Sequence, residues 1–474
     1  MIRSRRAAAS SSRVVAWPLV AVGLAMAACE KPPAAKVEAP KDAGAPARHV
    51  SVLVTGHETG HLVSDGPRLV AQWTAKEKWP DAIALSTGDI FSGLAVSSHF
   101  LGEPSAEVAK ALQYRAAALG NHDLDLGLET LRGFRSTSGL TFLAANLKDK
   151  AGAEQPLKLE PFTVIERGGI KVGVVGLTSG KTIGTTVAGR ASGLELIPTE
   201  AALPPALAGV KKAGAEVVVV LVDDCFDTLS KSFEGHPEWS ADLVVGSRCD
   251  GPNESKVRGI PFFSVGDDLS FYVSAAIELS GTGARSVKVA RTELAPKGPE
   301  DVDMVALRER WQKKLDEHLG QVIGFSKAGV AQEAPQLRTW VATALRDETK
   351  SDAGLINRKG IRSELPKGPI TKAHIYSMIP FENAVLTVKV TGETLEKLKA
   401  NPEAVLVLPP GKLEKEKEYQ LATTEYLYFG GDGLGLEAIA PHPELTGQVW
   451  QTPVIAWFER LQSSEKRPLE KLAK

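Results

Sequence analysis

The feature that most constrains this chain is a series of short apolar runs that alternate with helical patterns from His49 onward. Runs of this length without polar alternation are typical of strands that are covered on both faces. The sequence predicts such strands at Val50–Thr55, Ala82–Ser86, Leu140–Ala144, Val172–Leu177, Val217–Val222 and Leu243–Val245. The pattern therefore predicts an α/β fold with a buried sheet core.

Composition narrows the class of protein. The chain has 474 residues, of which 43% are hydrophobic and 24% are charged, and its formal net charge is −1. These values are ordinary for globular proteins and argue against a disordered, fibrous or multi-span membrane protein. The balanced charge gives no indication of a nucleic-acid polymer as partner. The length predicts more than one domain.

The N-terminal residues have the pattern of an export signal. Arginines precede an apolar run, Val14–Ala28, which is too short to span a bilayer comfortably and ends in small residues. The run ends at Met26-Ala27-Ala28-Cys29, which resembles a bacterial lipoprotein box and implies cleavage before Cys29 and lipidation of its sulfur. A plain secretory signal is the alternative. Glu30 stands where an aspartate would retain the protein in the inner membrane, so we expect outer-membrane anchoring.

Polar clusters follow several of the predicted strands. Gly88-Asp89 follows one strand, and Gly120-Asn121-His122-Asp123 follows the apolar stretch 116–119. The carboxyl ends of parallel strands meet at one edge of a sheet, where α/β proteins commonly bind ligands. We therefore expect these polar residues to lie close together.

Taken in order, these landmarks resemble the bacterial periplasmic and animal ectoenzyme 5′-nucleotidase family over nearly all of the mature chain. The resemblance implies a four-layer metallophosphoesterase-like β-sandwich flanked by helices, a linker helix, and a smaller α/β nucleotide-binding domain. The predicted boundaries are a signal peptide at 1–28, an Ala/Pro/Lys-rich tether at 29–48, the first domain at 49–298, the linker at 299–323 and the substrate domain at 324–474.

The resemblance also implies a centre of two divalent metal ions, with Mn, Zn, Co or Mg as candidates. Asp89 matches the bridging aspartate of the family, and Asn121 matches an asparagine ligand. His122 matches the histidine that faces the transferred phosphate, and Asp125 matches the carboxylate that orients it. An Asp–His pair suits proton transfer and the stabilisation of developing charge.

The other ligand positions depart from the family. His57-Glu58-Thr59 stands in place of Asp-x-His, Asp223 replaces a histidine, and Ser247-Arg248-Cys249-Asp250 replaces Gly-His-x-Gln. One interpretation is a remodelled site for one or two ions, in which His57, Asp223 and Asp250 ligate and Glu58 or His61 is recruited. The other is an empty site, because the fixed cation of Arg248 repels a metal.

Cys225 and Cys249 lie in loops where the family carries metal ligands. An exported protein meets an oxidising compartment, so a disulfide forms if their Cα atoms are within about 7 Å. The alternative is two buried free thiols.

The C-terminal part keeps more of the family pattern. Asn357 and Arg362 in NRKGIR match residues that contact the base and the phosphate. Phe381 and Asn383 belong to a Pro-Phe-x-Asn segment. Tyr426 matches the second aromatic of a base clamp, and Asp432, within Gly-Gly-Asp-Gly, matches the ribose contact. The resemblance thus implies a nucleotide or nucleoside ligand.

The predicted function is metal-dependent hydrolysis of nucleoside 5′-phosphates. The alternative is a catalytically silent nucleotide-binding or scaffold lipoprotein that keeps the fold and has lost most metal ligands. Retention of His122 with Asp125 favours the enzyme, whereas the altered ligands favour the silent protein. The only membrane contact expected is through the N-terminal lipid.

Overall fold

The computed structural model describes residues 46–79, 81–153, 157–187, 189–250 and 253–473. The predicted signal peptide and nearly all of the predicted tether lie outside these ranges. Over the described ranges, no helix has both the length and the apolar character needed to cross a bilayer. The first strand begins at Arg48, the last residue of the predicted tether.

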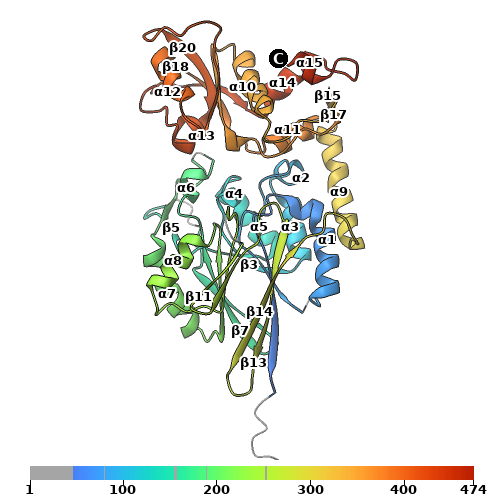
Figure 1. Cartoon of the computed structure of the whole chain (residues 1–474), viewed down its shortest axis with the longest axis vertical. Coiled ribbons are helices and arrows are strands. Elements are labelled where there is room, and N and C mark those ends of the chain that lie inside the picture. The colour runs from blue at the N-terminus through green and yellow to red at the C-terminus, as the bar shows by residue number, and fades with distance from the viewer. Residues whose placement is uncertain (1–45, 80, 154–156, 188, 251–252, 474) are drawn as a thin grey trace, which may run out of the picture. The chain divides into compact units, whose positions relative to one another are not determined.

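Two sheets form the first part of the fold (Figure 1). The first has the order β14 (Arg285–Glu293), β13 (Phe271–Leu279), β1 (Arg48–Thr55), β2 (Ile83–Ser86), β3 (Tyr114–Ala118) and β4 (Thr141–Leu143). The second has the order β11 (Glu254–Val257), β12 (Ile260–Ser264), β10 (Leu243–Gly246), β9 (Val217–Val222), β7 (Ile170–Leu177) and β6 (Phe162–Arg167). Strands β1 to β4 run parallel, as do β7, β9, β10 and β12, so their carboxyl ends share one edge.

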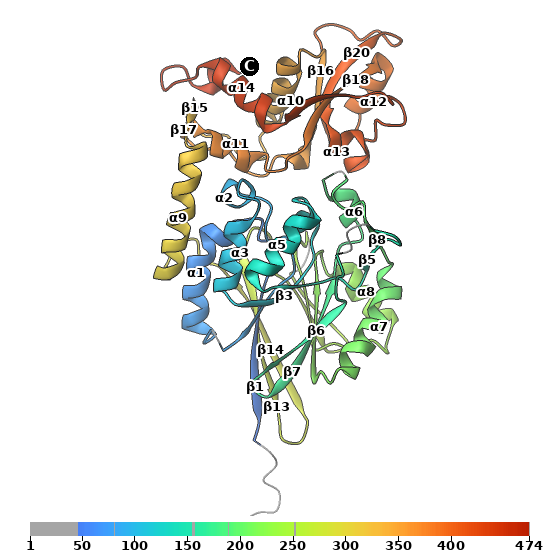
Figure 2. The same cartoon turned by 180° about the vertical axis from the view of Figure 1, so that it is seen from behind.

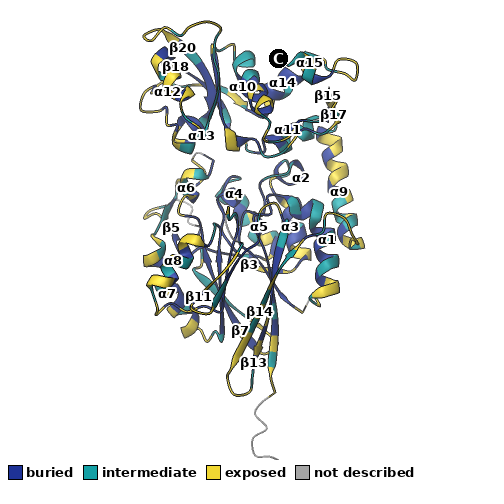
Figure 3. Ribbon diagram, in the orientation of Figure 1, coloured by how far each residue is buried: buried dark blue, intermediate teal, exposed yellow. Residues whose placement is uncertain are grey.

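Three apolar clusters separate four layers. Val52 and Val219 belong to a cluster made by facing strands of the two sheets. Trp73 belongs to a cluster that packs the first sheet against α1 (His61–Lys76), α3 (Glu103–Ala111) and α5 (Leu128–Ser138). Leu207 belongs to a cluster that packs the second sheet against α7 (Thr199–Lys212) and α8 (Asp227–Gly235). The helices thus cover the outer faces, and burial is greatest along the strands (Figures 1 and 3).

Short elements connect these layers near the carboxyl edge. They are β5 (Leu147–Asp149), β8 (Leu194–Leu196), α2 (Ala95–Ser98), α4 (Asn121–Leu124) and α6 (Thr182–Thr185). Helix α9 (Val302–Leu319) then leads to the second part of the chain. Asp301 caps this helix by accepting hydrogen bonds from the backbone N–H groups of Asp303 and Met304. Trp311 of α9 is 2% exposed and joins the core beneath α1, so the linker helix is packed rather than free.

The second part is built on a sheet with the order β19 (Ala404–Val407), β16 (Ala353–Asn357), β20 (Glu418–Thr424), β18 (Ala384–Thr391) and β21 (Glu444–Val449). Beside it, β15 (Val322–Ser326) pairs with β17 (Gly368–Thr371). Around these strands lie α10 (Pro335–Thr349), α11 (Lys372–Met378), α12 (Gly392–Lys399), α13 (Glu425–Tyr428), α14 (Gln451–Leu461), α15 (Leu469–Leu472), η1 (Arg358–Gly360) and η2 (Gly431–Gly433), as Figure 2 shows from behind.

Opposite faces of this second sheet are covered by different helices. Trp340 of α10 and Phe458 of α14 lie in one cluster, and Leu395 of α12 and Tyr428 of α13 lie in another. The layered arrangement confirms the predicted α/β fold class, with a sandwich followed by a linker helix and a smaller α/β unit. The predicted strands all occur, with ends that differ by at most two residues.

Candidate functional site

Side chains that the sequence analysis singled out gather at the carboxyl edge of the two sheets. His57, Asp89 and His122 follow β1, β2 and β3 of the first sheet. Asp223 and Arg248 follow β9 and β10 of the second sheet. His57, Asp89 and Arg248 have φ angles of 46°, 60° and 52°, which place these non-glycine residues in the left-handed region. Such conformations are uncommon and cluster at functional sites.

Asp89 is held by the loop that follows β3. Its Oδ1 accepts a 2.8 Å hydrogen bond from the backbone N–H of His122. Asp123 in turn accepts hydrogen bonds from the backbone N–H groups of Asp89, Ile90 and Gly120, at 2.9, 2.7 and 3.0 Å. A Cβ atom at Gly120 would lie 2.0 Å from Asp89 Oδ1, so only glycine permits this approach. The motif Gly120-Asn121-His122-Asp123 therefore positions the carboxylate of Asp89 through its backbone.

A guanidinium joins two buried carboxylates at this edge. Nη1 of Arg248 lies 3.5 Å from Asp89 Oδ2, and Nη2 lies 3.2 Å from Asp223 Oδ1. Nη2 also donates to the backbone oxygen of Asp223 at 3.1 Å. Asp89 and Asp223 are both 0% exposed. Asp223, which the sequence analysis predicts as a metal ligand, is engaged by Arg248 in this structure.

Burial and neighbouring charges shift the pKa values of Asp89, Asp223 and Arg248 in different directions. Burial opposes ionisation of Asp89, but His122, Arg248 and His57 outweigh it and lower its pKa. Burial raises the pKa of Asp223 well above its ordinary value, and Arg248 opposes that rise. Burial also disfavours the charge on Arg248, but Asp223 and Asp89 outweigh it and raise the pKa of Arg248. One guanidinium thus faces one firmly ionised carboxylate and a second that resists ionisation.

His57 is the remaining candidate ligand on the first sheet. Its Nε2 lies 3.6 Å from Asp89 Oδ2, and its Nδ1 lies 3.0 Å from Asp267 Oδ1. Burial lowers the pKa of His57, which favours the neutral imidazole that binds metals. One potential ligand atom from each of His57, Asp89 and His122 lies within 4.8 Å of the others. Oδ2 of Asp89 is buried and has no hydrogen-bond donor among the described residues.

These residues fit one divalent ion at most, and they do not fit the predicted pair. An ion bound to Asp89 Oδ2 would share that atom with Arg248, whose Nη1 is 3.5 Å away. Two unit positive charges about 4 Å apart repel by about 4 kcal/mol at the effective dielectric of 20 that is typical near a protein surface. A second ion on Asp223 would have to displace the guanidinium. A single ion at His57 and Asp89 would supply positive charge for phosphate oxygens.

The other residues considered as ligands lie elsewhere. Asp250, also predicted as a ligand, is exposed, and the side chain that this loop sends to the carboxylates is that of Arg248. Glu58 is buried and accepts hydrogen bonds from Thr55 and Ser86 at 2.6 and 3.0 Å. Burial raises the pKa of Glu58 to about 8, which makes it a poor metal ligand. His61 pairs instead with Asp65 of α1, at 3.1 Å.

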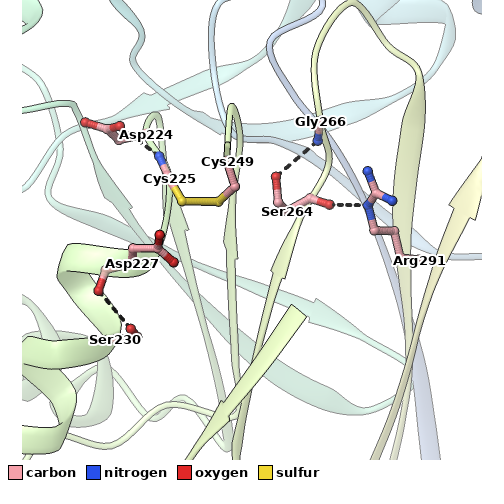
Figure 4. The surroundings of a disulfide bond; sticks show 8 residues. All are labelled: Asp224, Cys225, Asp227, Ser230, Cys249, Ser264, Gly266 and Arg291. Carbon is pink, nitrogen blue, oxygen red and sulfur yellow. Dashed lines mark hydrogen bonds between the residues drawn. A yellow bond between two sulfur atoms is a disulfide. The ribbon is translucent and has the colours of Figure 1, made fainter. Parts of the chain in front are cut away.

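A disulfide joins the two loops that carry Asp223 and Arg248. Cys225 and Cys249 are bonded, with their Cα atoms 4.6 Å apart (Figure 4). The structure thus selects the disulfide over the alternative of two free thiols. Asp224, next to Cys225, accepts hydrogen bonds from the Cys225 N–H at 2.8 Å and from Ser179 Oγ at 2.6 Å. The cross-link fixes Asp223 and Arg248 relative to each other.

His122 is held between the two parts of the chain. Its Nδ1 lies 2.7 Å from Asp125 Oδ2, and Arg362 Nη2 lies 3.0 Å from its Nε2. Because Asp125 accepts the Nδ1 proton, the Nε2 lone pair is the one that accepts from Arg362. The ring of Phe381 stacks on that of His122, with centroids 5.1 Å apart and an angle of 15°. Arg362 lies over the same Phe381 ring at 5.4 Å.

A second hydrogen-bonded group lies behind these residues. Asp432 accepts from Asn357 Nδ2 at 2.6 Å and from the hydroxyl of Tyr426 at 3.3 Å. Burial, together with the charge of Asp432, raises the pKa of Tyr426, which keeps the hydroxyl protonated. Gly431 is required here, because a Cβ atom would lie 2.4 Å from the Tyr426 ring. The glycine-rich turn thus places the tyrosine and the aspartate side by side.

One cavity of about 280 Å³ brings most of these residues together. Residues of both parts of the chain line it: Asn121, His122, Asp125, Ser179, Lys181, Thr185, Val187, Asp224, Arg248, Asn357, Lys359, Gly360, Arg362, Phe381, Asn383, Tyr426 and Asp432. All six predicted substrate residues are among them, with both members of the His122–Asp125 pair. His57, Asp89, Asp223 and Asp250 do not line this cavity among the described residues. Asn383 is 5% exposed, and its Oδ1 has no donor over the same residues.

Several contributors were not predicted from the sequence. Asp123 belongs to the motif Gly120-Asn121-His122-Asp123, but no role was predicted for it. It is the third residue of α4, a position from which a carboxylate can accept a hydrogen bond from the backbone N–H before the helix. Asp267 lies in the loop after β12, at the same sheet edge, and its carboxylate contacts His57, but it belongs to none of the sequence motifs. Lys181 lies in the loop after β7, and it reaches the cavity only because the sheets are stacked.

Comparisons with known proteins agree with this arrangement. A sequence profile described as 5′-nucleotidase, C-terminal domain, matches residues 322–404. The chain is 23% identical to a 5′-nucleotidase of Vibrio cholerae, over 66% of this chain and 66% of the relative. It is 24% identical to Endonuclease YhcR of Bacillus subtilis, over 68% of this chain but only 29% of the relative. The chain therefore spans less than two thirds of the length of these relatives.

Solved structures share the fold over most of the chain. A 5′-nucleotidase precursor from Thermus thermophilus has a TM-score of 0.73 at 20% identity, and covers 88% of this chain and 97% of its own. A 5′-nucleotidase from Candida albicans has a TM-score of 0.66 at 12% identity, and covers 88% of this chain and 99% of its own. The profile match over residues 322–404, the curated relatives and the shared two-domain fold all support a relationship of this chain to the 5′-nucleotidase family.

Proposed function

We propose that this chain is a 5′-nucleotidase-like phosphoesterase that acts on nucleoside 5′-phosphates. The observation that carries the proposal is the single cavity that unites the His122–Asp125 pair with Asn357, Arg362, Phe381, Asn383, Tyr426 and Asp432. A volume of about 280 Å³ is close to the lower end for small-ligand sites. Relatives named 5′-nucleotidase, from Vibrio cholerae and Bos taurus, support the substrate class.

His122 is the residue that faces the reacting phosphate in this proposal. Asp125 holds the Nδ1 proton, so Nε2 is directed toward Arg362 and the cavity. The same contact brings the Arg362 guanidinium, a suitable partner for phosphate oxygens, next to the imidazole. An imidazole in this position can hold or release a proton at Nε2 as charge develops on the phosphate.

The nucleoside would be held by the residues behind the phosphate position. Phe381 and Tyr426 provide aromatic faces, and stacking on a base contributes roughly 1–3 kcal/mol. Asp432 retains acceptor capacity for ribose hydroxyls besides its bonds to Asn357 and Tyr426. The unpartnered Oδ1 of Asn383 can accept a hydrogen bond from a nucleoside. Leaving such an atom unsatisfied costs free energy, which a ligand would recover.

The arrangement at Asp89 favours one further candidate function. Because Arg248 bridges Asp89 and Asp223, the domain could bind nucleotides without hydrolysing them. The same assay separates this candidate from the enzyme, since nucleotide binding without turnover is its expected result.

The test is phosphate release from 5′-AMP by the purified protein, with Mn²⁺, Zn²⁺, Co²⁺ and Mg²⁺ in turn and with EDTA. The His122→Ala variant should lose at least 100-fold in kcat, which is within the range of about 10²–10⁴ for a general acid–base residue. The matched control is His236→Ala, because His236 is a half-buried histidine that stacks on Trp239 outside the cavity. Turnover that His122→Ala leaves intact would contradict the assigned role, and no turnover with any ion would contradict the hydrolase.

We also propose that the protein is exported and lipid-anchored through Cys29. The motif Met26-Ala27-Ala28-Cys29 supports this, although these residues lie outside the described structure. Metabolic labelling with a fatty acid should mark the wild-type protein and not the Cys29→Ser variant. Equal labelling of both would contradict the anchor.

A further inference from the structure

Arg248 is a fixed cation at a position where the family resemblance predicts a metal ligand. Its guanidinium lies 3.5 Å from Asp89 Oδ2 and 3.2 Å from Asp223 Oδ1. Those carboxylates follow β2 and β9, which belong to different sheets, and Arg248 follows β10. The guanidinium therefore spans the junction between the two sheets.

Several features hold the Arg248 side chain in place. Cys249, the next residue, is bonded to Cys225, which lies two residues after Asp223. Arg248 itself has a φ of 52°, a conformation that the surrounding loop must enforce. The backbone oxygen of Asp223 accepts from Nη2 as well, at 3.1 Å. A side chain restrained in this way loses little further entropy when it binds a ligand.

The guanidinium also faces the nucleotide cavity. Its side chain is 28% exposed, whereas its two carboxylate partners are 0% exposed, and it lines the same cavity as His122 and Arg362. Arg362, from the second part of the chain, lines this cavity as well, and its Nη2 lies 3.0 Å from His122 Nε2. Arg248 and Arg362 thus act on one region from opposite parts of the chain.

The acidic residues of the cavity already have hydrogen-bond donors. Asp125 accepts from His122 and the N–H of Val187, Asp224 from Ser179 and the N–H of Cys225, and Asp432 from Asn357 and Tyr426. The basic side chains that line the cavity are Lys181, Arg248, Lys359 and Arg362. The lining is therefore suited to an anion.

We propose that the Arg248 guanidinium takes the place of one divalent ion and binds the phosphate of the nucleotide without metal. The inference rests on the proposed function, because it names the group that holds the substrate of that site. A guanidinium is permanently charged and matches phosphate oxygens with paired donors. It neutralises Asp89 as a metal ion would, while its remaining donors are available to the phosphate.

The experiment measures binding of 5′-AMP and adenosine by calorimetry in EDTA, with the purified protein and the Arg248→Gln variant. Arg248→Gln should weaken AMP binding at least tenfold and change adenosine binding less than twofold. The wild-type protein should also bind no more than one Mn²⁺ per chain when it is titrated with that ion alone. The matched control is Arg115→Gln, since Arg115 is an exposed residue of β3 that lies outside the cavity lining.

Removal of Arg248 leaves two buried carboxylates without a cation, which can unfold the site. Arg248→Gln combined with Asp223→Asn leaves one buried carboxyl group in place of two, and Arg248→Lys keeps a cation without the paired donors. Both should fold and bind adenosine, the first with the tenfold loss for AMP and the second with a smaller loss.

Two results would overturn the inference: AMP binding in EDTA that Arg248→Gln leaves unchanged, or the binding of two Mn²⁺ per wild-type chain. With either result, adenosine binding would still support the nucleoside site. Absence of both AMP and adenosine binding would instead overturn the proposed function, and the inference with it.

Discussion

The Cys225–Cys249 disulfide allows a quantitative prediction. The cross-linked residues are 24 apart in sequence, so the bond closes a loop that contains α8 and β10. For a loop of that length, the loss of chain entropy in the unfolded state corresponds to about 3.5 kcal/mol of stabilisation. Measured effects are commonly smaller. We therefore expect the Cys225→Ser/Cys249→Ser variant to lose about 2–3.5 kcal/mol in free energy of unfolding.

The assay is urea-induced unfolding followed by tryptophan fluorescence. Trp239 lies within the cross-linked loop, is 2% exposed, and packs edge-to-face on Phe233 with centroids 5.5 Å apart. Trp239 is one of eight tryptophans in the chain, and it contributes the part of the signal that comes from the region that the disulfide restrains. Wild-type protein in a reductant should unfold at the midpoint of the double variant, because both lack the same bond. The Cys29→Ser variant is the matched control and should retain the wild-type midpoint.

Two results would refute this reasoning. The first is a double variant that unfolds within about 0.5 kcal/mol of wild type, which is the range of neutral surface substitutions. The second is free thiol at Cys225 and Cys249 in denatured, unreduced protein. Either would show that the bond does not restrain the unfolded chain.

Further predictions concern the site and the linker. Gly431→Ala should weaken adenosine binding about tenfold in calorimetry, because its Cβ atom would lie 2.4 Å from the Tyr426 ring; unchanged affinity would argue against the clamp. Burial raises the pKa of Glu58 from 4.5 to about 8, so its contribution to stability is complete below pH 4.5 and is lost as the pH rises through 8. Urea unfolding should show that the free energy of unfolding falls by up to about 1.4 kcal/mol per pH unit between pH 4.5 and about 8. The Glu58→Gln variant cannot ionise at this position, so its free energy of unfolding should depend less on pH. An equal pH dependence in the variant and the wild type would contradict a buried neutral Glu58. Trp311→Ala should lower the free energy of unfolding by about 3–5 kcal/mol in the same assay, because Trp311 is buried. Lys313 on the same helix is exposed, so Lys313→Ala should leave the free energy of unfolding nearly unchanged. Equal effects of the two substitutions would contradict the packing of the linker helix.

Much of the fold was predictable because its signals are local. The run Val217–Val222 became β9 with the same ends, and the predicted linker helix at 299–323 contains α9, Val302–Leu319. Continuous apolar runs mark strands that are buried on both faces, and each run carries its own signal. The edge strands β11 and β14 were not predicted, because they are partly exposed and their patterns are weaker.

The candidate site was predictable only where a motif is contiguous. Asn357, Arg362, Phe381 and Asp432 were identified from short segments, and all of them line one cavity. The metal ligands were harder, because each comes from a different strand end. Asp250 was chosen by its alignment within a loop, whereas the fold directs Arg248 to the carboxylates and leaves Asp250 exposed.

The sequence by itself determined the α/β class, the order of the strands along the chain and the residue types available for a nucleotide site. Those properties depend on local periodicity and on short motifs, which neighbouring residues encode directly. Only the tertiary structure decided the role of Arg248. In the sequence it is an isolated cation that should repel a metal. In the fold it lies between Asp89 and Asp223, because stacking two sheets brings three separate strand ends within a few ångströms of one another.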